Sequence, residues 1–292
     1  MDPLFRVYLS SIRYTSTRGM AKKIVVNPRY EHLREYIQSV PENFDSLGEV
    51  LEARRNVLRQ HTVDGVTLVI KSFRRIYLPN RIRYSFFYPS KAQRAFDYGN
   101  VLLDKGFNTP APIAYIEVKR YGLISQSYFI SEYLDFQPLQ SVVKPASESV
   151  SEWIADFVKY TYRLHESNIY HVDYTLGNVL FKKQANGYEF ALVDNNRMRF
   201  GPVSLRKGIL NLVSLAVSVV DSTVMAKQYA LLRQTDATTS IGLLYHFKVV
   251  GSRKTQVRLF FKRLVKELRF CVWTSLLMMQ SLYWEISPAY LE

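Results

Sequence analysis

Alternating apolar and polar residues predict a β-hairpin in the first third of the chain. One run extends from Leu58 to Val63 and a second from Val66 to Phe73, and Asp64-Gly65 between them supplies the positive φ angles that a two-residue turn needs. Side chains alternate across a strand, so one face of the second strand carries Thr67, Val69, Lys71 and Phe73. The opposite face carries the aliphatic residues Val66, Leu68 and Ile70.

A helix and an extended segment are predicted after this hairpin. Residues Ser90 to Lys105 have a helical pattern, and Gly106 ends it. The segment Thr109-Pro110-Ala111-Pro112 is extended, because a residue that precedes proline avoids the helical region. Ser127 to Tyr133 is then predicted to form a further strand.

The second half of the chain has mainly helical periodicity. Ser149 and Glu152 have the spacing of a capping box and apolar residues follow at helical spacing, so we predict a helix from about Val150 to His165. Two strands follow, from Asn178 to Lys183 and from Tyr188 to Asp194, and the remainder is mostly helical in pattern. Strands therefore lie mainly before residue 135 and helices mainly after it, which predicts an α+β protein.

Length and composition allow two domains, or one bilobal unit, around a buried core. The chain has 292 residues, of which 48% are hydrophobic and 22% charged, so disordered and low-complexity proteins are excluded. The single cysteine, Cys271, excludes an intramolecular disulfide and a multi-cysteine metal site, and it fits a reducing compartment. The longest uncharged stretches, 208–220 and 270–284, are shorter than the roughly 20 residues that span a bilayer.

The first 19 residues differ in pattern from the rest of the chain. They contain scattered arginines and no clean apolar run before a small-residue cleavage site, so a signal peptide is not expected. Met20 opens the segment MAKKIVV, which has the pattern of a natural start followed by a strand. We therefore expect that Met20 is the initiator, or that residues 1–19 are a loose extension. The mass of the native protein distinguishes the two.

Two segments carry the whole net charge of +14. Between Gly65 and Phe96 there are seven Lys or Arg residues and no acid, and between Phe247 and Phe270 there are eight against one glutamate. A concentrated basic field indicates an anionic partner. The charge alone leaves open whether this partner is nucleic acid, acidic lipid headgroups or a phosphorylated substrate.

The two basic segments have different patterns. The C-terminal one places Arg258, Lys262, Lys266 and Arg269 on one helical face and apolar residues on the other. It predicts either a packed terminal helix with a solvated face, which we favour, or a surface helix bound to an anionic membrane. The first segment is interleaved with aromatic residues, which suits single-stranded nucleic acid as well as a phosphorylated, lipid-anchored sugar.

A turn at Asn186-Gly187 would bring several polar side chains together. If these residues close an antiparallel hairpin, Asn178 faces Asn195 and lies within one register step of Asp194. His171-Val172-Asp173 comes directly before this hairpin, so two carboxylates and a carboxamide converge. Such hard oxygen ligands suit Mg²⁺, which binds through one or two carboxylates together with substrate phosphates.

The same residues resemble the active site of protein kinases. His171-x-Asp173-x-x-x-x-Asn178 matches the catalytic-loop pattern H-R-D-x-x-x-x-N, and Asp194 ends a strand sixteen residues later, where kinases have the aspartate of D-F-G. Lys71, at the end of Leu68-Val69-Ile70-Lys71, resembles the strand lysine of V-A-I-K. Taken singly, each match has an ordinary explanation, such as a turn residue or a solvated lysine. All four in order are a strong signal.

Further segments resemble the lipopolysaccharide core kinases, the Kdo and heptose kinase family with its cold-inducible relatives. They are Ser90-Lys91-Ala92, Gly106 to Pro112, Leu164-His165, Asn168 to His171 and Val193 to Met198. The resemblance covers roughly residues 20–230. It implies a bilobal protein-kinase-like α+β fold, in which a mostly β lobe at 20–133 follows the extension at 1–19 and a mostly helical lobe at 134–292 ends in the basic region.

This resemblance implies a role for each matching residue. Lys71 would hold the α- and β-phosphates of ATP, and Asp173 would accept the proton of a sugar hydroxyl and orient it in line with the γ-phosphate. Asn178 and Asp194 would hold Mg²⁺, and His171 would support the loop. The hinge beside adenine would consist of the backbone groups of Glu132, Tyr133 and Leu134.

Three features depart from the kinase pattern. No G-x-G occurs, so the loop over the phosphates is unassigned. The helix after Lys71 has no obvious glutamate to pair with it, and Asp97, the nearest acid, is not assigned that role. Asp194 is followed by Asn195-Asn196 instead of Phe-Gly and no A-P-E follows, so a regulated activation loop is not expected.

Other functions stay open from the sequence. His165 and His171 could form a metal pair, although buried, hydrogen-bonded histidines are favoured because no third ligand is near. A choline- or aminoglycoside-type kinase would share the site but needs an acidic pocket, which the net charge disfavours. A catalytically inactive kinase-like binding protein would explain the missing glycine loop, and a nucleic-acid binder would bind single strands in a salt-dependent manner.

The sequence thus predicts an ATP- and Mg²⁺-dependent kinase that phosphorylates a sugar hydroxyl of a lipopolysaccharide-type glycolipid. The alternatives are an inactive kinase-like regulator or a kinase of another small molecule or protein, and nucleic acid is the less expected partner. We expect a cytoplasmic protein with peripheral contact to an anionic membrane, at the inner face of the inner membrane. The acceptor sugar, its hydroxyl and the oligomeric state are not specified by the sequence.

Overall fold

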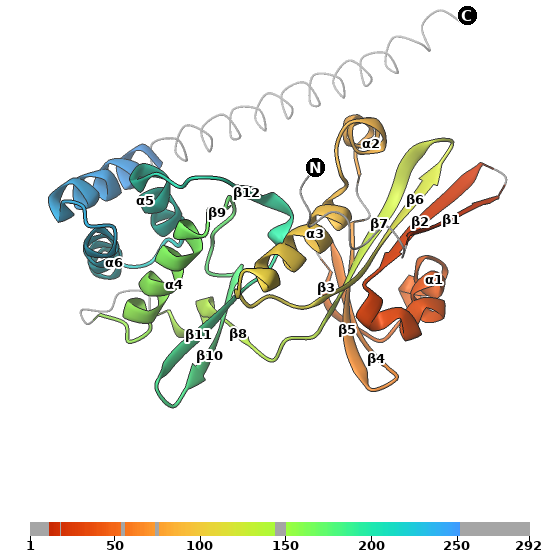
Figure 1. The fold of residues 1–292 in the computed structure, drawn as a ribbon, viewed down its shortest axis with the longest axis horizontal. Helices are drawn as coiled ribbons and strands as arrows, with labels where there is room; N and C mark the ends of the chain where they lie inside the picture. Colours follow the sequence, from red (N-terminus) through yellow and green to blue (C-terminus); the bar gives the residue numbers. More distant parts are fainter. Residues whose placement is uncertain (1–11, 18, 54–55, 74–75, 144–149, 252–292) are drawn as a thin grey trace, which may run out of the picture.

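One large antiparallel sheet forms the N-terminal part of the molecule (Figure 1). The computed structural model describes residues 12–17, 19–53, 56–73, 76–143 and 150–251. In spatial order the strands are β1 (Ile12–Thr17), β2 (Met20–Val26), β6 (Pro112–Arg120), β7 (Leu123–Glu132), β5 (Val66–Ser72), β4 (Val57–Val63) and β3 (Glu49–Ala53). The helices of this part are α1 (Arg34–Asn43), α2 (Leu78–Phe86) and α3 (Lys91–Asp104), with 3-10 turns at Pro28–Leu33 and Phe44–Ser46.

The C-terminal part is mainly helical and contains two small sheets (Figure 1). Its helices are α4 (Ile154–Glu166), α5 (Leu205–Ser214) and α6 (Val219–Leu232), and residues 237–251 are also helical. The sheets are β8 (Gln137–Pro138) with β10 (Val179–Gln184) and β11 (Gly187–Leu192), and β9 (Ile169–His171) with β12 (Met198–Phe200). The 3-10 turns are η5 (Leu139–Val142) and η6 (Asn195–Arg197). The predicted α+β class is therefore confirmed.

The β4–β5 hairpin forms as predicted. Its turn residues Asp64 and Gly65 have φ angles of +48° and +77°, and Val63 pairs with Val66. Leu68 and Ile70 are fully buried in the core between the sheet and α1. Their burial fixes the face of β5, because a one-residue slip would place both in water.

Helix α3 connects the two parts of the molecule and also forms as predicted. Ser90 caps its start by accepting a hydrogen bond from the Gln93 N–H (3.1 Å), and Gly106, with a φ of +75°, follows its end. Its first turns are buried against β6, whereas Leu102 near its end belongs to the core of the C-terminal part. Figure 1 shows α3 between the sheet and the helical part.

The predicted capping box of α4 is wrong. The helix begins at Ile154 and its first residues have no side-chain cap, while Ser149 lies outside the described residues. The Ser151 N–H instead donates to Asp221 (3.1 Å), and the Glu152 carboxylate contacts Lys183 on β10 (3.4 Å). The Glu152 carboxylate, one of the two side chains of the predicted capping box, is therefore used in a tertiary contact.

The described residues before Met20 include a strand. Ile12–Thr17 form the edge strand β1, paired with β2 from Ile12↔Val25 to Thr17↔Met20, because the open edge of β2 offers its backbone groups. The expectation of a loose extension is thus wrong for these residues, and 1–11 and 18 lie outside the described ones. Met20 as initiator and the lobe boundary at 133 stay predictions.

The basic face predicted between Arg258 and Arg269 lies outside the described residues, as does Cys271. Within the part of the chain that the structure describes, no helix has both the length and the apolar character needed to cross a membrane.

Candidate active site

The loop between β9 and β10 holds two of the predicted site residues. Hydrogen bonds from Thr175 N to Asp173 O and from Asn178 N to Thr175 O, both 2.9 Å, close two successive turns. The Asn178 side-chain N–H also donates to Asp173 O (2.8 Å). Asn178 therefore holds the loop in the conformation that presents the Asp173 carboxylate, which is 39% exposed.

The predicted register of the next hairpin is wrong by two residues. The turn is Ala185-Asn186, and Gly187 is already paired with Gln184 in β11. The φ of Gly187 is +134°, and a Cβ atom there would lie 2.5 Å from the Asp156 carboxylate, so the glycine serves this close approach instead of the turn.

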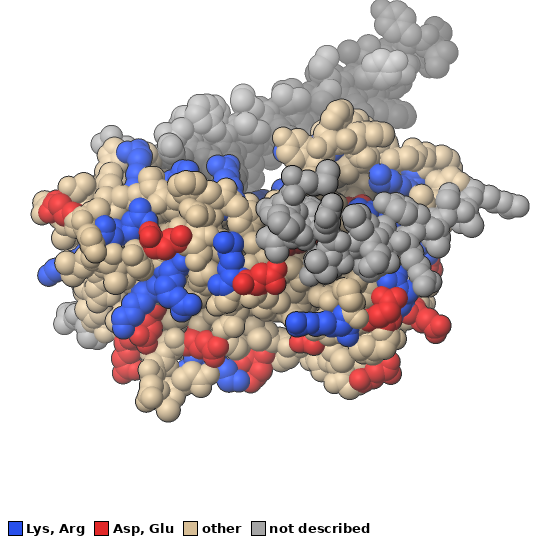
Figure 2. Space-filling model, viewed as in Figure 1, with Lys and Arg blue, Asp and Glu red and all other residues tan. Residues whose placement is uncertain are grey.

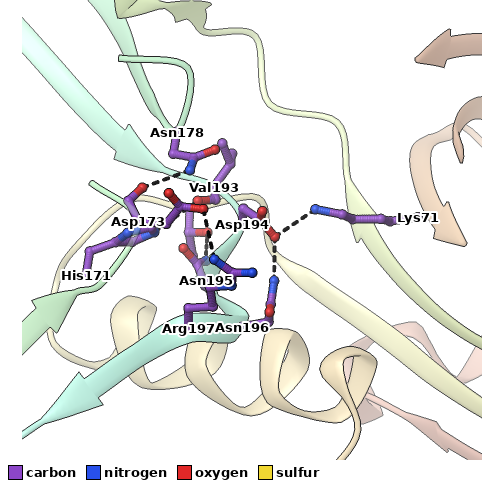
Figure 3. A network of polar contacts seen from close by, with 10 residues as sticks. Lys71, His171, Asp173, Asn178, Val193, Asp194, Asn195, Asn196 and Arg197 are labelled. Atoms are coloured by element: carbon purple, nitrogen blue, oxygen red, sulfur yellow. Dashed lines mark hydrogen bonds and ion pairs between the residues drawn. The ribbon is translucent and has the colours of Figure 1, made fainter. Parts of the chain in front are cut away.

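Asn178 consequently faces Val193 instead of Asn195, and Val193 N donates to Asn178 O (3.0 Å). Asp194 is still the next residue, so the expected convergence of Asp173, Asn178 and Asp194 is found (Figure 3).

Asp194 has an unusual backbone conformation. Its φ of +57° and ψ of 42° are left-handed, which is rare outside glycine but tolerated by aspartate. The η6 turn begins immediately afterwards, and its Asn196 donates a side-chain hydrogen bond to Asp194 Oδ1. The chain thus reverses locally at the end of β11 while the carboxylate is held by its own turn.

Lys71 reaches across from β5 to this carboxylate. The Lys71 Nζ lies 2.8 Å from Asp194 Oδ1, although the residues are 123 positions apart in the sequence (Figure 3). Burial by itself would raise the pKa of Asp194, but the neighbouring ammonium outweighs it and holds that pKa below its usual value. Asp194 is therefore an ionised carboxylate.

Arg197 is a site residue that was not predicted from the sequence. Its guanidinium Nη1 lies 3.6 Å from Asp173 Oδ2, and the side chains are 49% and 39% exposed. Arg197 ends the η6 turn, which follows Asp194 directly, so it lies three residues after this carboxylate. The spacing Asp194-x-x-Arg197 was the signal that could have indicated it.

Two buried histidines, His165 and His171, belong to a hydrogen-bond network beneath the loop, on its side toward the protein core. The His171 carbonyl accepts from Asn211 Nδ2 (3.0 Å), and Asn211 Oδ1 lies 3.0 Å from His165 Nε2. The other nitrogen of His165 contacts the Tyr229 hydroxyl (2.8 Å). Burial lowers the pKa of His165 to about 4 and also lowers that of His171. Both rings are neutral, as expected for buried, hydrogen-bonded histidines. Among the described residues, no group of three or more His, Cys, Asp and Glu is arranged so that it could hold a metal ion.

The predicted hinge residues are only in part free to bind a base. The N–H groups of Glu132 and Tyr133 already donate to the carbonyls of Ala111 (2.9 Å) and Thr67 (2.8 Å). The Glu132 carboxylate accepts from the Tyr30 hydroxyl (2.7 Å). Of the three predicted residues, Leu134 is therefore the one whose N–H remains the candidate donor.

A cavity of about 100 Å³ lies between the large sheet and the start of η6. Apolar side chains and the Lys71–Asp194 pair contribute to its lining; the residues are Leu58, Val69, Lys71, Ala95, Thr109, Pro110, Phe129, Ser131, Val193, Asp194 and Asn195. Ligand pockets are commonly about 300–1,000 Å³. A nucleotide would therefore have to widen this cavity, and its phosphates would compete with Asp194 for the lysine.

Asp97 on α3 does not replace the missing glutamate. The charges that act on its carboxylate are those of Lys23 and Glu117 on β2 and β6. Burial raises the pKa of Asp97 to about 6. Because the pKa of Asp97 is higher in the folded than in the unfolded protein, the fold favours the protonated carboxyl. As the pH rises from about 4 through 6, ionisation of this carboxyl therefore lowers the stability of the fold.

We expect Asp97→Asn to stabilise the protein at pH 7.5 by on the order of 2 kcal/mol, because it removes a buried charge. Urea unfolding measures this, and the gain should shrink at pH 4.5, where the folded wild type is already protonated. Asp104→Asn, at an exposed site on the same helix, should change stability by about 0.5 kcal/mol or less. An equal gain at both pH values would contradict the titration of Asp97.

The sheet, the helical part and the loop residues between them together define a protein-kinase-like phosphotransferase. The chain belongs to the lipopolysaccharide kinase (Kdo/WaaP) family, whose family model matches residues 44–235. The predicted family and the kinase class are thus confirmed. A comparison with curated proteins gave no significant match.

Many solved structures match this one, and they include the following two. WaaP in complex with acyl carrier protein has a TM-score of 0.54 and 17% sequence identity, over 79% of this chain and 98% of that chain. The Rio2 kinase–ADP/Mg²⁺–phosphoaspartate complex from Chaetomium thermophilum has a TM-score of 0.41 and 16% identity, over 85% of this chain and 78% of that one. The likeness to WaaP supports the predicted kinase-like fold.

Proposed function

We propose that this protein transfers the γ-phosphoryl group of ATP, with Mg²⁺, to a sugar hydroxyl of a lipopolysaccharide-type glycolipid. The proposal rests above all on one observation, the 2.8 Å contact between Lys71 and Asp194 beside the Asp173–Asn178 loop. This arrangement brings together a lysine that could bind phosphates, oxygen ligands that could bind a metal ion, and a carboxylate that could accept the proton of a hydroxyl group. Membership of the family supports the sugar acceptor.

The nucleotide end of the site would consist of Lys71, Asn178 and Asp194. Asn178 donates its side-chain N–H to Asp173 O, which leaves its carbonyl oxygen as a ligand, and Asp194 is ionised. This pair of hard oxygen donors fits Mg²⁺, which would neutralise phosphate charge during transfer. When a nucleotide binds, Lys71 would leave its contact with Asp194 and bind the phosphates instead.

The acceptor end would consist of Asp173 and Arg197. The Asp173 carboxylate would accept the proton of the attacking hydroxyl, a role that needs an exposed acceptor within hydrogen-bond reach of the sugar. Arg197, 3.6 Å away, would balance the charge of this carboxylate and present guanidinium N–H groups to anionic groups of the acceptor.

The test is phosphorylation of a defined acceptor. Glycolipid from a strain that lacks the gene is incubated with the purified protein, ATP and Mg²⁺, and mass spectrometry is expected to find the gain of one phosphoryl group. Removal of Mg²⁺ with a chelator should abolish the gain, and added Mg²⁺ should restore it. No gain on any lipopolysaccharide acceptor, with no thermal shift by ATP and Mg²⁺, would favour a binding protein without activity.

A further inference from the structure

Helix α2 presents its apolar side outwards. Leu78, Ile82 and Phe86 recur every four residues, so they form one stripe, and they are 58%, 43% and 66% exposed. None of the nine residues of this helix is buried. Adjacent apolar residues extend the stripe, and together they form the α2 surface: Tyr77, Leu78, Ile82, Phe86, Phe87 and Tyr88.

Polar contacts hold α2 in this orientation. The guanidinium Nε of Arg81 donates to the Ile124 carbonyl (2.9 Å), and the Ser85 hydroxyl accepts from the Ile124 N–H (2.8 Å). Lys119 Nζ also lies 3.4 Å from the Ser85 carbonyl. The side of the helix that faces β6 and β7 is therefore its polar side, the reverse of a helix that packs on a protein core.

The surroundings of the α2 surface are basic. The chain has no acid between Gly65 and Phe96, and the exposed Arg83 stacks on the Tyr88 ring at 4.3 Å. A hollow of about 530 Å³ beside the end of α2 is lined by Lys22, Lys23 and Lys119 among aromatic side chains. Its one carboxylate, Glu117, is buried and lies opposite Lys23 in the register of β2 and β6, while Lys22 contacts Glu42.

We propose that the α2 surface docks on an anionic membrane, with the apolar stripe in the interface and the neighbouring lysines and arginines at lipid phosphates. A lipid bilayer is the partner that combines an apolar layer with negative charge directly above it. In Figure 2 the projection that carries α2, at the top of the coloured part and slightly right of its centre, is mainly uncharged on the visible face. The proposal rests on the proposed function in one respect, that the acceptor is anchored in lipid.

Docking through α2 would bring the active site to its substrate. Helix α3 is the next element after α2 in the chain, and it packs against η6. The η6 turn carries Asn196 and Arg197, which lie beside the proposed catalytic residues. The α2 surface and the acceptor end are thus connected by one rigid helix.

The test is co-sedimentation of the full chain with vesicles of phosphatidylcholine, with and without phosphatidylglycerol. The combined variant Leu78→Ser, Ile82→Ser, Phe86→Ser should bind the anionic vesicles about tenfold more weakly than the wild type. Arg83→Gln should weaken binding about fivefold, since one cation near the surface is lost. The folding of both variants is checked by thermal unfolding.

The matched control is the combined variant Val219→Ser, Val220→Ser, Leu231→Ser, which removes three equally exposed apolar side chains from α6 and should bind as the wild type does. Phosphate transfer to a deacylated, water-soluble acceptor should be equal in all these variants. Wild-type binding that the α2 changes leave intact, or no binding to anionic vesicles at all, would overturn the inference. Failure of the proposed function is a different result, since the wild type would then not phosphorylate the soluble acceptor whatever its vesicle binding.

Discussion

Asp173→Ala is expected to abolish phosphoryl transfer and to leave ATP binding largely intact. The Asp173 side chain is 39% exposed and takes no part in the hydrogen bonds of the loop. The Asp173 backbone carbonyl accepts those bonds, so the fold should persist in the variant. Loss of a general base commonly lowers the rate by about 10²–10⁴-fold. Single-turnover transfer and a separate titration with ATP measure the two properties.

The matched control for this variant is Glu152→Ala, which removes an exposed acid of the same part of the protein, paired with Lys183. It should retain full activity. Transfer by Asp173→Ala above about 1% of the wild-type rate would contradict the role as base. Equal loss of transfer and of ATP binding would indicate instead that the residue shapes the nucleotide site.

Local chemistry made the predicted elements of the N-terminal part reliable. The turn at Asp64-Gly65 needs two positive φ angles and the start of α3 needs a cap such as Ser90, and both requirements are satisfied within a few residues. Such signals act through the backbone of their own segment. They therefore survive whatever packs around them.

Contacts between distant segments account for the errors. Lys183 binds the Glu152 carboxylate that would have taken part in capping α4, and the close approach of Asp156 requires the glycine that was assigned to the turn. Helix α2 (Leu78–Phe86) was not predicted from the sequence, and its apolar stripe faces outwards.

The sequence predicted which residues of the candidate site lie near one another, but it did not predict which of their side chains are in direct contact. The spacing of Asp173, Asn178 and Asp194 indicated a shared location through the kinase pattern, and the structure places them together with Lys71. The direct pairing of Lys71 with Asp194 and the contact of Arg197 with Asp173 depend on how α3 and η6 pack. No local pattern encodes how these elements pack, although the spacing Asp194-x-x-Arg197 could have indicated that Arg197 lies near Asp194.

Lys71→Met should abolish nucleotide binding and activity. It should also reverse the contribution of Asp194 to the pH dependence of the free energy of unfolding. In the wild type the lowered pKa of Asp194 contributes stability that is present above the ordinary aspartate pKa and is lost as the pH falls. Without the ammonium, burial remains and favours the protonated carboxyl. The variant should therefore be destabilised by on the order of 1–2 kcal/mol at pH 7.5 and by less at pH 4.5.

The double variant Lys71→Met, Asp194→Asn separates the two effects, because it removes the unpaired carboxylate as well. It should regain most of the stability at pH 7.5 in urea unfolding while transfer and nucleotide binding stay lost. Lys182→Met is the matched control, since this lysine pairs with Asp135 at 3.0 Å on the surface, where an ion pair contributes about 0–1 kcal/mol. If the single and double variants were equally unstable, the contact between Lys71 and Asp194 would not govern the charge of that carboxylate, and the competition of phosphates with Asp194 for Lys71 would lose its basis.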